Sequence, residues 1–185
     1  MKTIWAANWM VLGCACVALM AAGCNSAMTP TNAKLEQAMN TYFEGHNECL
    51  FPTGRSFPYE VTPGSDAKTD KKQMDAMRIS GLLTEEDDFE THVPRYKLTA
   101  LGQRMAPRFC YGHKVVTSVD GFTVPVKQGN VMETTATYHA KMIDVPVWTQ
   151  TDELEAAFPQ MGAAISGPQP GQIVVATAGV GWAVR

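Results

Sequence analysis

The sequence lacks the short motifs by which several large enzyme classes are recognised. It contains no Gly-x-Ser-x-Gly, no His-Glu-x-x-His, no Cys-x-x-Cys and no phosphate-binding glycine loop. Each of these motifs sets reactive or phosphate-binding groups at a fixed spacing, so their absence argues against the enzyme classes that they mark. Gly179 and Gly181 form a Gly-x-Gly pair without the third glycine of a dinucleotide site. We therefore expect a protein that is not an enzyme, although missing motifs alone leave catalysis open.

A surplus of basic residues is also absent. The chain has 15 Lys and Arg residues against 18 Asp and Glu residues, which gives a formal net charge of −3. A protein that binds nucleic acid needs a positive surface to neutralise phosphates. We therefore expect no nucleic-acid partner.

Histidines are few, and their spacing does not favour a metal site. The four histidines stand far apart, and only His113 and His139 could meet across neighbouring strands. Two imidazoles alone form a weak metal site. The acidic run Glu85–Asp88 lacks the spacing of a calcium loop. We expect neither a metal ion nor a cofactor.

Charge is missing from residues 3–23, which follow Lys2. The run closes with Leu-Met-Ala-Ala-Gly-Cys at residues 19–24, which resembles the signal peptide and lipobox of a bacterial lipoprotein. The resemblance implies cleavage before Cys24 and acylation of that residue, with palmitate among the acyl chains. An uncleaved anchor and ordinary secretion remain alternatives, because about 21 uncharged residues can span a bilayer.

The same resemblance implies a location in the cell. Residue 25 is Asn and not Asp, which by the sorting rule of enterobacterial lipoproteins favours the outer membrane. The protein is then expected to face the periplasm, held by its lipid. Residues 1–23 would be the signal peptide, residues 24–31 a short polar tether, and residues 32–185 a single α+β domain.

The cysteines predict one disulfide. Of the five cysteines in the chain, Cys14 and Cys16 fall in the predicted signal peptide and Cys24 carries the predicted lipid. Cys49 and Cys110 remain, and an even pair in an oxidising compartment favours a bond between them. Two free, buried cysteines are the alternative.

Two helices are predicted in the first half of the chain. Residues 32–47 place apolar side chains at i, i+3, i+4, i+7 and i+8, and Thr31 or Asn32 can cap the start. Residues 66–80 form the second helix, which Gly81 is placed to end. This helix carries four basic residues, which we interpret as a solvated face.

From Phe109 onward the pattern changes to strands. Residues 131–142 alternate between apolar and polar side chains, as expected of a sheet with one solvated face. Asp120-Gly121 predicts either a hairpin or a bulge. A short helix is expected at 151–158, ended by Pro159, then a loop at 162–171 and a last strand at 173–184. The fold class is α+β, with an antiparallel sheet of three or four strands and one inserted short helix.

Residues 77–84 and 96–102 resemble parts of a winged-helix segment. The first stretch ends a helix in Gly81-Leu82-Leu83, and the second reads Tyr-x-Leu-Thr-x-x-Gly. Most of residues 74–184 also resembles small, uncharacterised lipoproteins of proteobacteria. In a periplasmic protein, the winged-helix resemblance implies a scaffold or a protein-docking surface.

Two functions are compatible with these patterns. The first is a non-enzymatic lipoprotein that docks an envelope protein, with Phe51, Phe57, Tyr59 and Trp148 as aromatic residues of a docking surface or of the core. The second is a small-ligand-binding protein or enzyme with a pocket on the sheet. The residues that would converge in that pocket are Tyr111, His113 and Tyr138.

Overall fold

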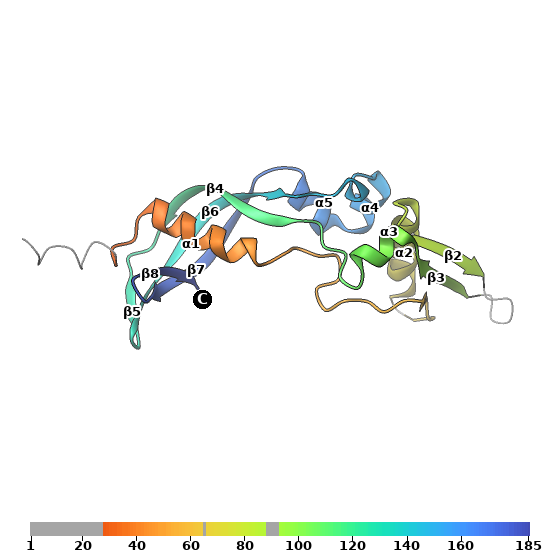
Figure 1. Cartoon of the computed structure of the whole chain (residues 1–185), viewed down its shortest axis with the longest axis horizontal. Coiled ribbons are helices and arrows are strands. Elements are labelled where there is room, and N and C mark those ends of the chain that lie inside the picture. The colour runs from red at the N-terminus through yellow and green to blue at the C-terminus, as the bar shows by residue number, and fades with distance from the viewer. Residues whose placement is uncertain (1–27, 65, 88–92) are drawn as a thin grey trace, which may run out of the picture.

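The computed structural model describes residues 28–64, 66–87 and 93–185, so the predicted signal peptide and Cys24 lie outside the described residues. Figure 1 shows an elongated molecule with two lobes. The sheet lobe contains helix α1 and strands β4–β8, and the helical lobe contains strands β1–β3 and the remaining helices. Each lobe has its own cluster of buried apolar side chains. Within the described residues, no helix is both long and apolar enough to cross a membrane.

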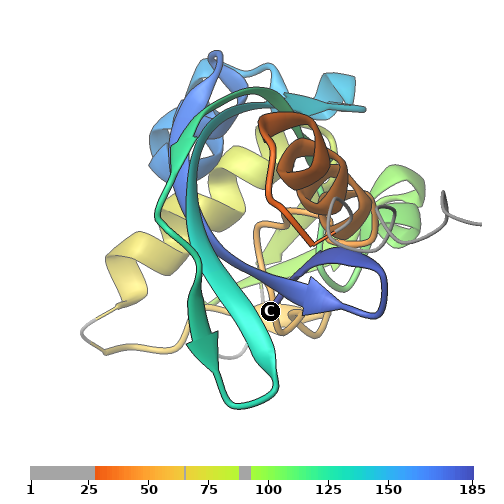
Figure 2. The ribbon, with the colours of Figure 1, turned by 90° about the vertical axis from the view of Figure 1, so that its left-hand side faces the viewer.

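The sheet lobe is an antiparallel sheet that curls around α1 (Figure 2). The strand order is β4-β6-β7-β8, and β5 pairs with β6. Apolar residues of α1 such as Leu35, Met39 and Phe43 pack against Tyr138 and Val175 of the sheet. The elements are α1 (Asn32–Glu44), β4 (His113–Phe122), β5 (Val126–Gln128), β6 (Val131–Ile143), β7 (Gln169–Ala178) and β8 (Gly181–Val184).

The helical lobe combines a small sheet with short helices. Strand β3 lies between β1 and β2, and both pairings are antiparallel. Helix α2 packs against α4, and Tyr96 of β3 is fully buried beneath α2. The elements are β1 (Tyr59–Glu60), α2 (Ala67–Ile79), β2 (Leu83–Asp87), β3 (Pro94–Leu98), α3 (Ala100–Met105), η1 (Val147–Thr149), α4 (Asp152–Ala157) and α5 (Pro159–Ile165).

The α+β class is confirmed, but the predicted strand count is too low. The C-terminal sheet has five strands, and a second, three-stranded sheet precedes it. The predicted last strand is a hairpin, because Gly179 adopts a positive φ of 59° and turns the chain between β7 and β8. The predicted loop at 162–171 is wrong at both ends, since residues 162–165 belong to helix α5 and residues 169–171 to strand β7. Pro159 ends α4 as expected but also stands at the first position of α5, where proline is favoured.

Asp120 and Gly121 lie within one strand and not in a hairpin. The β4–β6 register shifts between Val119 and Gly121, as in a β-bulge. The bulge alternative is therefore the right one.

A narrow waist joins the two lobes, and the disulfide lies in it. Cys49 and Cys110 are bonded across 61 residues of sequence, as predicted. Beside the bond, the Glu48 N–H donates to the Gly112 carbonyl at 2.8 Å, and the Tyr111 N–H donates to the Glu48 carbonyl at 2.8 Å. Two of the segments that cross the waist, one leaving α1 and one entering β4, are therefore paired and cross-linked.

Candidate functional site

The three residues of the predicted sheet pocket lie in different places. Tyr111 is buried in the core of the helical lobe beside the disulfide, and Tyr138 is buried in the core of the sheet lobe. His113 is at the start of β4, on the wall of an open groove against α1. Burial raises the pKa of both tyrosines, and the nearby Glu48 raises that of Tyr111 further. Their hydroxyls are therefore un-ionised at neutral pH, and the three side chains do not converge on one ligand.

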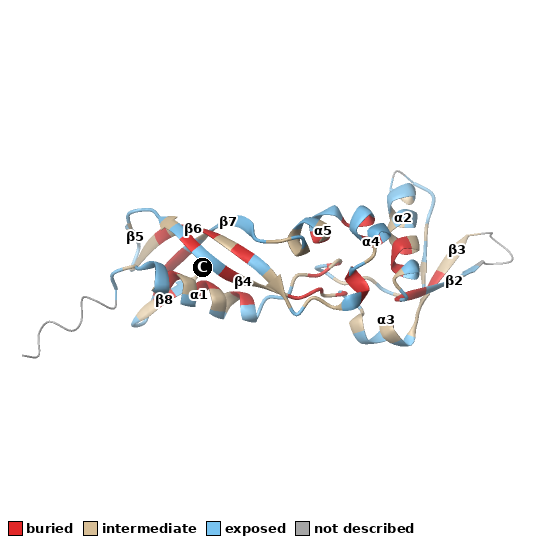
Figure 3. Ribbon diagram, turned by 90° about the horizontal axis from the view of Figure 1, so that it is seen from above, coloured by how far each residue is buried: buried red, intermediate tan, exposed pale blue. Residues whose placement is uncertain are grey.

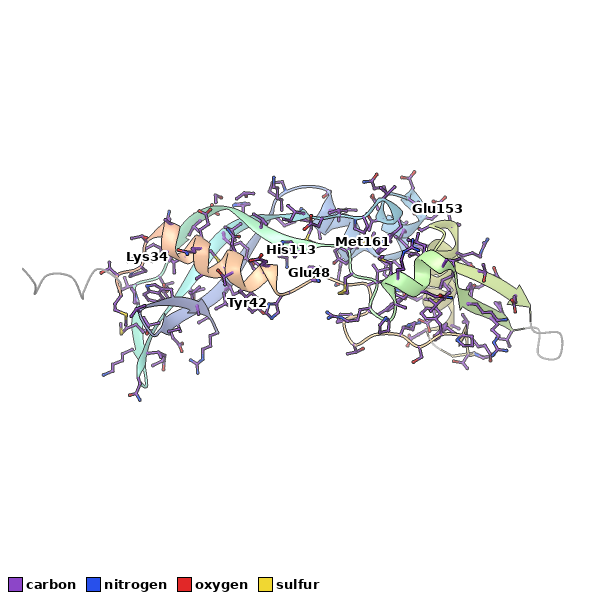
Figure 4. The ribbon with its side chains drawn as sticks, in the orientation of Figure 1. Lys34, Tyr42, Glu48, His113, Glu153 and Met161 are labelled. Carbon is purple, nitrogen blue, oxygen red and sulfur yellow. A yellow bond between two sulfur atoms is a disulfide. The ribbon has the colours of Figure 1, made fainter. Side chains whose placement is uncertain are left out.

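The groove beside His113 runs between α1 and β4, and we name it the α1–β4 groove. It has a volume of about 730 Å³. Its wall includes three carboxylates, those of Glu36, Glu44 and Asp144, and Asp144 Oδ2 lies 3.6 Å from His113 Nδ1. Figure 4 shows His113 next to the ribbon of α1. This acidic, open groove suits a small cation or a polar ligand better than an apolar one.

His113 and His139 do not meet. His113 pairs in register with Ile143, whereas His139 lies opposite Ser118 and contacts Asp120 at 2.8 Å. Among the residues that the structure describes, no three His, Cys, Asp or Glu side chains come together as metal ligands.

The aromatic residues considered for a docking surface belong to the core. Phe51 and Trp148 are buried, and Phe57 and Tyr59 pack against the same cluster. The ring of Phe51 meets those of Phe109 and Phe158 edge-on. These side chains hold the helical lobe together and do not offer a surface to a partner.

A shallow groove on the outside of the helical lobe combines an apolar floor with basic residues. It lies between α2 and α4 and has a volume of about 440 Å³, and we name it the α2–α4 groove. Ala76, Ile79 and Ala156 form its floor, and Ile79 is 50% exposed. Its remaining lining residues are all charged: Lys68, Lys71, Lys72, Asp75 and Glu153.

Hydrogen bonds fix the charged wall of this groove. Asp75 accepts a hydrogen bond from Lys71 Nζ at 2.8 Å and another from the buried Tyr96 hydroxyl at 2.7 Å. Burial alone would raise the pKa of Asp75, but the bonds from Lys71 and Tyr96 outweigh it and lower that pKa below 3.8. Lys72 Nζ donates to the Ala156 carbonyl at 2.7 Å, which joins α2 to α4. Asp75 therefore stays ionised, and the groove keeps a fixed shape.

Sequence reasoning did not identify the α2–α4 groove. It interpreted the basic residues of this helix as a solvated face. The signal that it missed is the phase of Ile79, which lies away from the buried Met74 and Met77 on a helix of 3.6-residue period.

The α1–β4 and α2–α4 grooves are not recognisable by likeness to other proteins. Comparison with protein-family models, with curated proteins and with solved structures gives no match to this chain.

Proposed function

We propose that this protein is a lipid-anchored periplasmic lipoprotein that docks another envelope protein and does not catalyse a reaction. The lipobox-like residues 19–24 support the anchor, on the outer membrane as the Asn at position 25 favours. The observation that carries the docking role is the position of the α2–α4 groove. Lys34, near the start of the described chain, and Glu153, on the groove wall, lie in opposite lobes of the molecule (Figure 4).

The chemistry of the groove defines the partner. Ile79, Ala76 and Ala156 fit an apolar side chain, and the ammonium groups of Lys68 and Lys72 fit carboxylates beside it. Such an arrangement, apolar at the centre and charged at the rim, is typical of protein–protein contacts. The proposed partner therefore presents one or two apolar side chains flanked by acidic residues.

Cross-linking in the cells that produce the protein tests this role. A photo-activatable amino acid replaces Ile79 in the full chain, and the matched control replaces Val174, which is 40% exposed on β7 of the sheet lobe. We expect one defined adduct from position 79 and none of the same mass from position 174.

Charge reversal decides whether the adduct reflects the proposed chemistry. Lys68→Glu should abolish the adduct at position 79, whereas Lys141→Glu, on the exposed end of β6, should leave it unchanged. An adduct that is unaffected by Lys68→Glu, or equal at positions 79 and 174, would contradict the docking role.

A second candidate function is supported by the α1–β4 groove. Its three carboxylates and His113 favour a small organic cation as ligand. Calorimetry with a diamine as probe tests this alternative. Binding that Asp144→Asn weakens and Asp152→Asn does not would support it.

A further inference from the structure

Exposed apolar side chains gather at the free end of the sheet lobe. Three segments lie at this end: the start of the described chain, the β4–β5 connection with β5, and the turn from β7 to β8 (Figures 1 and 3). Val124 is 83% exposed, Val126 54% and Val180 88%, and Met28 and Phe122 are 38% exposed. In the described part of the chain, the other large apolar residues of comparable exposure are Ile79, Val147 and Val174. We name this end the apolar tip.

The apolar tip is cationic. Residues 28–34, 121–132 and 178–184 contain Lys34 and Lys127 and no Asp or Glu. The flanking carboxylates of β4 and β6 are already paired, Asp120 with His139 and Glu133 with Arg185. An end with exposed valines, two lysines and no carboxylate complements an anionic phospholipid surface.

The short stretch of chain between Cys24 and Met28 limits how far the tip can lie from the membrane. Cys24 precedes Met28 by four residues, and four residues span at most about 14 Å even when fully extended. An acylated Cys24 therefore holds Met28, the first described residue of the tip, within about 14 Å of the membrane surface, whereas the α2–α4 groove is in the other lobe.

We propose that the apolar tip contacts the phospholipid surface and holds the long axis of the molecule away from the membrane. This proposal rests on the lipid anchor of the proposed function. The acyl chains retain the protein, and the valines and lysines of the tip set its orientation. The partner is the headgroup layer of an anionic bilayer.

Depth-dependent fluorescence quenching tests the orientation. Acylated full-length protein is reconstituted in vesicles of phosphatidylethanolamine and phosphatidylglycerol that contain brominated lipid. A polarity-sensitive dye is attached to Val124→Cys or Val180→Cys in the tip. The matched control is Val147→Cys in the helical lobe, which is equally exposed at 81%.

We expect the two tip dyes to be quenched at least about threefold more than the control dye. Lys127→Gln should reduce quenching at position 124, and Lys141→Gln should not. Equal quenching at the three positions would overturn the tip contact. Energy transfer between tip dyes that rises with protein density would overturn it in favour of a second copy of this chain.

The intact mass of the reconstituted protein separates the two proposals. Acyl mass on Cys24 with equal quenching overturns the tip contact and leaves the anchor standing. If the chain carries no acyl mass, the lipid anchor is absent, and the proposed tip contact is then contradicted as well. Loss of the cross-link at Ile79 bears on the docking role alone.

Discussion

At the scale of single residues, the waist depends on the absence of a side chain at Gly112. This residue has a φ of 116°, and a Cβ added here would overlap the carbonyl oxygen of Ile143. Both its conformation and its close packing therefore require glycine. The contact keeps the segment that enters β4 against the end of β6.

Gly112→Ala should lower the free energy of unfolding by about 3 kcal/mol, because it combines backbone strain with a clash against a carbonyl group. Chemical denaturation measures the change. Gly121→Ala is the control, since an added Cβ at Gly121 meets no atom within 4 Å. Equal stability of the two variants would show that the waist is not closely packed at Gly112.

Asp75 should make stability depend on pH. Its folded-state pKa lies below the ordinary value of 3.8, so its stabilising contribution is present above that value and is lost as the pH falls through the folded-state pKa. Between pH 5 and pH 2, the wild type should therefore lose stability more steeply than Asp75→Asn. Asp66→Asn, at a cap position with no side-chain hydrogen bond, should follow the wild type. Parallel curves for all three proteins would exclude this role of Asp75.

Several residue roles were predictable from the sequence because they depend on neighbours along the chain. Thr31 and Thr151 accept hydrogen bonds from backbone N–H groups three residues later, as expected of helix caps. The Cys49–Cys110 bond followed from cysteine number and the expected compartment. The surroundings of Tyr111 and Tyr138 were not predictable, since they depend on which lobe each residue enters.

At the scale of elements, the sequence patterns predicted features that depend on one segment alone. They missed features that depend on the pairing of two segments. The alternation in β6 identified its buried face, which includes Ala136, Tyr138 and Ala140. Strand β2 contains most of the acidic run Glu85–Asp88, for which the sequence predicted no strand. It is a strand because it pairs with β3, where Glu86 meets Lys97 at 2.5 Å.

The contact between α1 and the edge of β4 gives a prediction at this scale. The side-chain oxygen of Asn40 accepts a hydrogen bond of 2.8 Å from the Val116 N–H. Asn40→Ala leaves this donor unpaired and should cost about 1–2 kcal/mol of unfolding free energy. Gln37→Ala, an exposed change on the same helix, should cost less than about 0.5 kcal/mol. Similar costs for both would argue that Asn40 does not fix α1 to the strand.

At the scale of the whole molecule, two lobes with separate cores share a cross-linked waist. The sequence did not predict this shape, because the chain passes between the lobes after α1, α3, β6 and α5. A pattern in one segment does not show which lobe the next segment joins. The elongated shape is what separates the predicted anchor from the α2–α4 groove.

Loss of the disulfide should weaken the waist. The bond closes a loop across 61 residues, and replacing both Cys49 and Cys110 with Ala should lower the free energy of unfolding by about 2–4 kcal/mol. Denaturation of the oxidised wild type, the reduced wild type and the double variant measures this. The last two should agree. No difference among the three would mean that the waist is held by packing alone.

Anchoring at one end is the central claim, and intact mass measured on protein from membrane fractions tests it most directly. We predict a chain that starts at Cys24 and carries acyl mass, in which Cys49 and Cys110 react with an alkylating reagent only after reduction. An unprocessed chain with two free thiols would contradict the anchor, the expected compartment and the membrane contact of the apolar tip together.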